Sequence, residues 1–123
     1  MTNTTSQPVT WFEIATADPS GARRFYGELF GWSFTDDDAA GSDYQMVHVG
    51  PDQIGGGLAD TKGAPANHAI FYVQVPDVAE ACLRAETLGG KVVVPPTEPG
   101  GGLVFAQLLD GDGNLIGVWT PPA

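Results

Sequence analysis

The chain contains one pattern twice, 59 residues apart, and this repeat restricts its fold more than any other feature. A segment from Phe12 to Asp18 leads into a stretch with helical spacing that ends at Gly31, and a segment from Phe71 to Asp77 leads into a similar stretch that ends at Gly90. A repeat of this kind predicts two half-domains of one plan, and we expect a ligand on a concave sheet surface shared by both. The positions that match between the copies are Phe12 with Phe71, Ile14 with Val73, Asp18 with Asp77, Ala22 with Ala81, Leu29 with Leu88 and Gly31 with Gly90.

Local patterns in the first half predict a strand, a helix and three further strands. Residues 9–16 alternate and include Trp, Phe and Ile, which is typical of a strand. Asp18 and Pro19 are a helix cap and a first helical residue, and Gly31 ends the helix that follows. The further strands are expected at residues 32–35, 44–49 and 53–59, with an acidic turn at 36–42.

The second half repeats this order after a linker at residues 61–67, which contains Gly63 and Pro65. A strand is expected at 68–75, then a helix capped by Asp77 and ended by Gly89 and Gly90, then strands at 91–94, 103–109 and 115–120. Each half is therefore predicted to be β-α-β-β-β. The expected division is a flexible tail (1–8), a first module (9–60), the linker and a second module (68–120), within one domain overall.

Composition excludes several classes of partner. The net charge of −10 repels nucleic acid and anionic lipid, and it favours neutral or cationic ligands. No apolar run is long enough to span a membrane, and the polar start of the chain has no apolar signal core. Cys82 is the single cysteine, so neither a disulfide framework nor a multi-cysteine zinc site is expected. These features predict a cytoplasmic protein.

Two motifs and the repeat together carry a family resemblance over about residues 9–120. The first helix begins Asp-Pro at residue 18 and carries Phe-Tyr at 25–26 before Leu-Phe-Gly-Trp at 29–32. The chain closes with Asp-Gly-Asp-Gly-Asn at 110–114 before Leu-Ile-Gly-Val-Trp at 115–119. With its doubled β-α-β-β-β module, the chain resembles the vicinal oxygen chelate superfamily, the group of glyoxalases, bleomycin-resistance proteins and extradiol dioxygenases.

This resemblance implies an α+β fold in which the two modules form a half-open mixed-sheet barrel. It also implies a homodimer, because cavities in the family are often completed by a second subunit. It does not select one activity, since the family includes isomerases, lyases, dioxygenases, thiol transferases and drug-sequestering proteins.

The metal enzymes of this family place four ligands on the concave face, one on the first and one on the last strand of each half. Here the first-strand positions are Trp11 and Ile70, and the last-strand positions are Gly57 or Leu58 and Gly117. None of these side chains can coordinate a hard or borderline divalent ion, which needs His, Glu or Asp. We therefore predict no metal and no other cofactor.

Three ionisable side chains are candidates for the site. Glu13 and His68 share the face of Trp11, because alternate residues of a strand point the same way. A carboxylate on a central strand is costly to bury, so Glu13 is a candidate general base or an anchor for a basic ligand nitrogen. The alternatives are a structural Glu13 bonded to backbone or to Tyr72, a solvent-exposed His68, and a weak metal site rebuilt by His68 and His48.

Aromatic residues point to an organic ligand. Trp11, Tyr72 and Trp119 fall on the inward face, and Gly117 leaves space beside Trp119. Aromatic walls with few polar groups suit a flat, partly apolar molecule, although the rings could simply fill the trough between the half-sheets. Four other aromatic residues are assigned to the core between helix and sheet, namely Phe25, Tyr26, Phe30 and Phe71.

The leading functional hypothesis is metal-independent binding of a small, partly aromatic molecule, similar to the drug-binding, bleomycin-resistance-type relatives and compatible with a role in antibiotic resistance. The expected ligand-binding residues are Trp11, Glu13, His68, Tyr72, Gly117 and Trp119. The alternative is an enzyme, a glyoxalase-like lyase, isomerase or cyclase with Glu13 as its general base. A second alternative is a module that binds a partner and no ligand.

Overall fold

The computed structural model describes residues 5–37, 41–64 and 67–122, which form two compact units. We call Trp11–Ile70 the N-terminal unit, and Met1–Thr10 with Phe71–Ala123 the C-terminal unit. The two units do not follow the module boundaries expected from the repeat. His68 to Ile70, at the start of the second module, belong to the N-terminal unit, whereas Val9 and Thr10, at the start of the first module, belong to the C-terminal unit. The division into modules, tail and linker stays a prediction.

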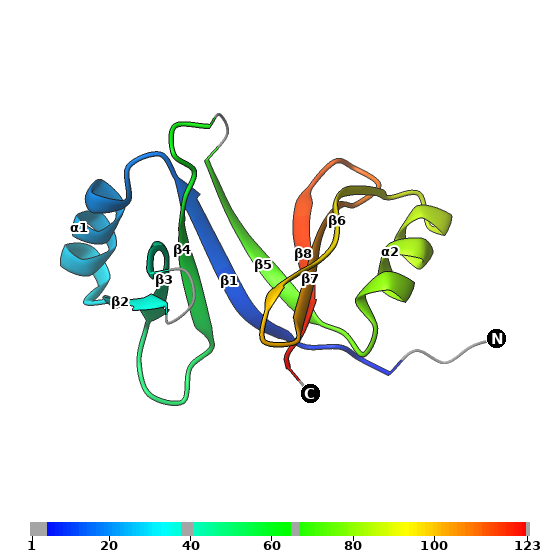
Figure 1. The fold of residues 1–123 in the computed structure, drawn as a ribbon, viewed down its shortest axis with the longest axis horizontal. Coiled ribbons are helices and arrows are strands. Elements are labelled where there is room, and N and C mark those ends of the chain that lie inside the picture. The colour runs from blue at the N-terminus through cyan, green and yellow to red at the C-terminus, as the bar shows by residue number, and fades with distance from the viewer. Residues whose placement is uncertain (1–4, 38–40, 65–66, 123) are drawn as a thin grey trace. The chain divides into compact units, whose positions relative to one another are not determined.

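The N-terminal unit contains a helix and a four-stranded sheet in the order β2-β3-β4-β1 (Figure 1). Strand β1 runs parallel to β4, and β3 runs antiparallel to both β2 and β4, so the sheet is mixed. The elements are β1 (Val9–Thr16), α1 (Pro19–Phe30), β2 (Ser33–Asp37), β3 (Gly41–His48) and β4 (Gly55–Asp60).

Helix α1 begins and ends as its sequence predicts. The Asp18 carboxylate accepts a hydrogen bond from the Gly21 backbone N–H at 3.0 Å, and Pro19 occupies the first turn, where no N–H is needed. Gly31 ends the helix in the left-handed region, with φ of 75°, and its N–H bonds to the Gly27 carbonyl. The sheet side of α1 packs on a core of Ile14, Val47 and Leu58, with Phe12, Ala22, Tyr26, Trp32, Phe34 and Val49 around it.

Three of the four aromatic residues assigned to the core are largely exposed, so that prediction was wrong for them. Phe25 and Phe30 are 58% and 55% exposed, and Phe71 is also exposed. Ala22 and Tyr26 lie one turn apart and point at the sheet, whereas Phe25 is rotated about 100° from Tyr26. Tyr26 does pack on the core and stacks on Trp32, with ring centroids 5.3 Å apart.

The C-terminal unit repeats this plan, with strand order β5-β8-β7-β6, β5 parallel to β8 and the other neighbours antiparallel (Figure 1). The Asp77 carboxylate caps α2 by accepting from the Glu80 N–H at 3.1 Å. The core consists of Val75, Val78, Cys82, Ala106, Leu108 and Val118. The elements are β5 (His68–Gln74), α2 (Val78–Thr87), β6 (Lys91–Gly100), β7 (Leu103–Leu109) and β8 (Leu115–Thr120).

These elements confirm the predicted α+β class and the doubled β-α-β-β-β order, with differences at element ends. Strand β2 continues through Asp37, so part of the expected acidic turn is strand. Strand β6 continues past Pro95 to Gly100, although it was expected to end at residue 94. It lies at the end of its unit's strand order and pairs irregularly with β7, and such strands tolerate proline. The remaining parts of the expected tail, turn and linker, at 1–4, 38–40 and 65–66, lie outside the described residues.

Candidate functional site

Each sheet has one face that packs on its helix and an opposite face, which we call the helix-free face. In the N-terminal unit Ile14 packs in the core beside α1, so Trp11 and Glu13 point to the helix-free face. The register places Gly55 opposite Trp11 and Gly57 opposite Glu13. Of the two last-strand positions considered for the family's metal, Gly57 therefore lies on this face, and the buried Leu58 lies in the core.

Trp11 lies against the glycine-rich strand β4. A Cβ atom added to Gly55 would lie 2.8 Å from the Trp11 ring, closer than side chains tolerate. The indole N–H of Trp11 donates to the Tyr44 hydroxyl at 3.0 Å, and that hydroxyl occupies the space where a side chain at Gly57 would be. The two glycines thus allow the two aromatic side chains to lie close to the sheet. Tyr44 was not predicted as a site residue. It lies four residues from His48 on β3, so the two side chains leave the strand on the same face.

Glu13 and His68 form a close pair. The Glu13 Oε2 and His68 Nε2 atoms are 2.8 Å apart, and the two side chains are 11% and 21% exposed. An ionised carboxylate can only accept, so Nε2 carries the proton in this contact when Glu13 is ionised. The structure therefore brings together two residues that strand parity placed on one face, and the imidazole of His68 is a partner of the Glu13 carboxylate.

His48 lies apart from this pair. Its Nε2 atom is 2.9 Å from the Thr35 hydroxyl, and its side chain is exposed. Within residues 5–37, 41–64 and 67–122, no three His, Cys, Asp or Glu side chains gather as a metal-binding group. The positions where the family resemblance led us to expect metal ligands are Trp11, Ile70, Gly57 and Gly117, and none of these residues has a side chain that coordinates a divalent ion.

The helix-free face of the C-terminal unit carries Tyr72, Gly117 and Trp119. The Tyr72 ring lies directly on Gly117, where an added Cβ would collide with it, so the space expected beside Trp119 is filled by this ring. Tyr72 is 3% exposed, and its hydroxyl accepts a hydrogen bond from the Gln107 amide at 2.9 Å. The Trp119 indole N–H donates to the Thr10 hydroxyl at 3.0 Å. Gln107, opposite Gly117 in the register, was not predicted.

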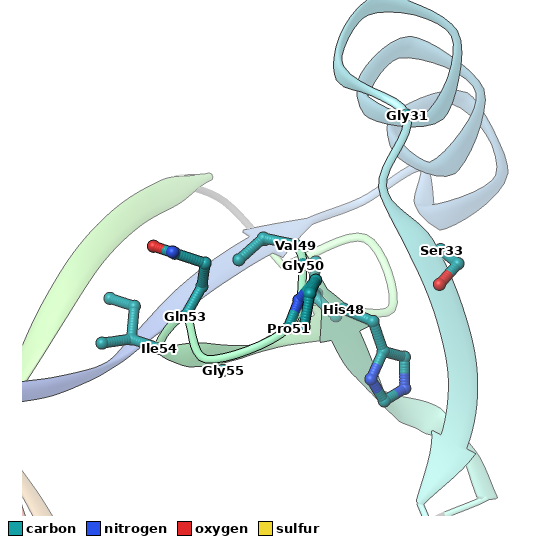
Figure 2. A pocket seen from close by; sticks show the side chains of 10 residues that line it. Gly31, Ser33, His48, Val49, Gly50, Pro51, Gln53, Ile54 and Gly55 are labelled. Carbon is teal, nitrogen blue, oxygen red and sulfur yellow. The ribbon is translucent and has the colours of Figure 1, made fainter.

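Two shallow hollows lie in the N-terminal unit, and neither is lined by Trp11, Glu13 or His68. One, of about 490 Å³, lies at the turn between β3 and β4. Figure 2 shows the His48 ring and the Ser33 side chain on one side of this hollow, with Gln53 and Ile54 on the other. The other, of about 310 Å³, lies beside α1. The predicted residues therefore lie on a sheet face rather than in either hollow.

Cys82 has no place in this chemistry. Its side chain extends from α2 into the core, and burial followed by the nearby Glu86 charge raises the pKa of its thiol. Neither α1 nor α2, the helices of the described residues, is long and apolar enough to cross a bilayer.

Comparisons with known proteins agree with this architecture. Methylmalonyl-CoA epimerase from Mycobacterium tuberculosis superposes with a TM-score of 0.64 at 16% identity, covering 94% of this chain and 88% of that one. The protein BH1468 from Bacillus halodurans gives a TM-score of 0.66 at 12% identity, with 97% of each chain covered. At these identities the likeness shows the fold alone.

Two curated relatives are similar in sequence. A Mycobacterium bovis protein provisionally named glyoxylase CFP32 is 27% identical over 114 residues, covering 89% of this chain and 44% of the relative. The anthracycline biosynthesis protein DnrV of Streptomyces peucetius is 30% identical over 125 residues, covering 89% of this chain and 45% of the relative. The chain thus spans less than half the length of these relatives. A family model matches residues 9–118, and the chain belongs to the Glyoxalase/Bleomycin resistance protein/Dioxygenase superfamily.

Proposed function

We propose that this chain binds a small, partly aromatic organic molecule without the metal ion used by many members of its family. The observation that supports this most is the helix-free face of the N-terminal unit. There the Trp11 ring lies on a glycine strand, and the Glu13–His68 pair projects from the same face. An aromatic surface beside a few polar groups is the usual composition of a site for a flat organic ligand.

Each residue of this face has a proposed role. Trp11 is the stacking surface, Glu13 is the polar or charged anchor, and His68 is its hydrogen-bonding neighbour. A cationic ligand would gain from the Trp11 ring and from the net charge of −10. In the C-terminal unit we propose Trp119 as a second stacking surface, with the buried Tyr72 and Gly117 supporting its sheet.

The family relatives support a polycyclic ligand. One relative is named for anthracycline biosynthesis, and anthracyclines are flat, fused-ring molecules. Binding without chemical change would resemble the drug-sequestering, bleomycin-resistance branch of the family and would provide resistance to such a compound. We further propose a cytoplasmic homodimer, which sedimentation equilibrium of the purified chain would test: a mass of twice 12.8 kDa supports the dimer, and a monomer contradicts it.

Tryptophan fluorescence provides the experiment, because the chain has three tryptophans in different surroundings. The metal-stripped protein is titrated with an amino-sugar anthracycline in the presence of a chelator. We expect saturable quenching that is reduced in Trp11→Phe. The control is Trp32→Phe, because Trp32 packs on the core beside Tyr26 and should not report the ligand.

Three outcomes of this titration contradict the proposal. The first is absence of saturable quenching for anthracyclines and for a wider panel of aromatic natural products. The second is equal quenching in Trp11→Phe and Trp32→Phe. The third is a stoichiometric divalent ion, found by elemental analysis, whose removal abolishes binding.

A further inference from the structure

We infer that His68, oriented by Glu13, is a general base that removes a proton from an acidic C–H of the ligand. This inference rests on the proposed ligand-binding face and adds a reaction to it. Glu13 itself was a candidate general base from its place on the strand, and here it is the residue that orients His68. In the structure Glu13 is the more buried member of the pair, and His68 is the more accessible one.

The contact indicates which ring nitrogen of the neutral imidazole carries the proton. Nε2 of His68 faces the Glu13 carboxylate at 2.8 Å, and a carboxylate accepts but does not donate when ionised. The neutral imidazole therefore holds its proton on Nε2, and its lone pair is on Nδ1. A carboxylate that holds one nitrogen of a histidine and leaves the other as a base is a common catalytic arrangement.

The position of the pair brings this base to a bound ring. Trp11 and Glu13 lie two residues apart on one strand, so their side chains emerge on one face about 7 Å apart. A planar molecule stacked on Trp11 extends over that distance. His68 is hydrogen-bonded to Glu13 and so lies at the same end of the face.

The chemistry needs no further reagent. Nδ1 of His68 takes the proton from the carbon next to a carbonyl group of a planar aromatic ketone. The C–H bond breaks, and its electron pair moves to the carbonyl oxygen and gives an enolate. The imidazolium that forms lies against the Glu13 carboxylate, which stabilises its charge. Return of the proton to another carbon, or to the other side of the same carbon, gives an isomer and restores His68.

A purely structural role is the competing explanation, in which the pair only ties β1 to the start of β5. A chromogenic carbon acid separates the two explanations. In 5-nitrobenzisoxazole a base removes the ring C–H proton, the N–O bond breaks, and a coloured cyanophenolate forms. The probe is flat and aromatic, and its conversion requires only a base beside a surface that holds the ring.

The measured quantity is the second-order rate constant for this ring opening, since it needs no saturation by the probe. We expect His68→Gln to lower it about 100-fold, because general bases contribute about 10²- to 10⁴-fold. The matched control is His48→Gln, which removes the other histidine of the chain and should leave the rate unchanged. Glu13→Gln keeps an acceptor oxygen but loses the charge, so we expect about a 10-fold fall in the same rate constant.

A spectroscopic readout separates positioning by Glu13 from mere folding. In ¹⁵N NMR spectra of the unmodified protein at pH 8, His68 should be the tautomer protonated on Nε2. The population of this tautomer should fall in Glu13→Gln if the Glu13 carboxylate sets it, and the rate constants of the histidine variants separate a base from a purely structural pair. A His68 protonated on Nδ1 in the unmodified protein overturns the inference without any variant.

The failure of this inference is distinguishable from that of the proposed function. Equal rate constants for the unmodified protein and His68→Gln, with anthracycline quenching intact, overturn the base and leave the binding face. A rate constant that depends on His68, with quenching unaffected by Trp11→Phe, supports the base and contradicts Trp11 as the stacking surface.

Discussion

A methyl group added at Gly117 tests how closely the Tyr72 ring lies on its neighbouring strand. The Cβ of Gly117→Ala would overlap the ring atoms of Tyr72, which is almost fully buried. The ring must therefore move, and its hydrogen bond from Gln107 is strained or lost. Overpacking costs about 1–3 kcal/mol, and loss of a hydrogen bond adds about 1 kcal/mol, so we expect a destabilisation of about 2–4 kcal/mol.

Thermal unfolding followed by circular dichroism measures this effect. For a chain of this size about 1 kcal/mol corresponds to about 4 °C, so Tm should fall by about 8–16 °C. The matched control is Gly111→Ala in the same unit, where an added Cβ meets nothing within 4 Å and φ is not positive. That substitution should change stability by less than about 0.5 kcal/mol.

A double-mutant cycle assigns the cost to the Tyr72 ring. In a Tyr72→Ala background the added methyl group has room, so Gly117→Ala should cost less than about 0.5 kcal/mol. Close packing of the Tyr72 ring on Gly117 is refuted if Gly117→Ala is no more destabilising than Gly111→Ala. It is also refuted if the cost is unchanged when Tyr72 is already alanine.

Three further predictions concern the core, a thiol and a turn. Of Leu58 and Phe30, only Leu58 is buried, so Leu58→Ala should lower the free energy of unfolding by about 2–5 kcal/mol and Phe30→Ser by less than about 1 kcal/mol. Equal losses of unfolding free energy in denaturant titrations would contradict this assignment of the core. Burial raises the pKa of the Cys82 thiol, so iodoacetamide should label this thiol much more slowly in the folded chain than in the urea-unfolded chain at pH 7.5. Mass spectrometry measures the labelling, and equal rates in the two states would contradict the burial of Cys82. Hydrogen bonds from the Asn114 side chain and nearby backbone N–H groups lower the pKa of Asp110. These bonds therefore stabilise the fold at pH values above the pKa of the unfolded carboxyl, and the stabilisation is lost as pH falls through the pKa of the folded state. The difference in unfolding free energy between the natural chain and Asp110→Ala should shrink in acid, and a difference that stays constant with pH would contradict this direction.

Strand parity and the repeat predicted the fold and one face well. Residues two apart on a strand share a face, so Trp11 and Glu13 could be placed together from sequence, and the repeat placed His68 on the same parity. The helix caps at Asp18 and Asp77 were readable because the capping oxygen and the N–H that it accepts from are only three residues apart.

Contacts that depend on pairing between strands were not predictable. Tyr44 and Gln107 reach Trp11 and Tyr72 through registers that a single sequence does not specify. The exposure of Phe25 also escaped prediction, because helical spacing does not tell how wide a stripe the sheet covers. The pairing of Glu13 with His68 required the distance between two strands that are 55 residues apart in the chain.

We propose that the face carrying Trp11, Glu13 and His68 holds an aromatic molecule without a metal ion. Two-dimensional NMR of the tryptophan indole N–H groups tests it most directly, with chelator present and an amino-sugar anthracycline as probe. We predict a saturable shift of the Trp11 indole signal, with the Trp32 signal unmoved. A Trp11 signal that stays fixed while the anthracycline binds, or that moves only after a divalent ion is added, would contradict the account.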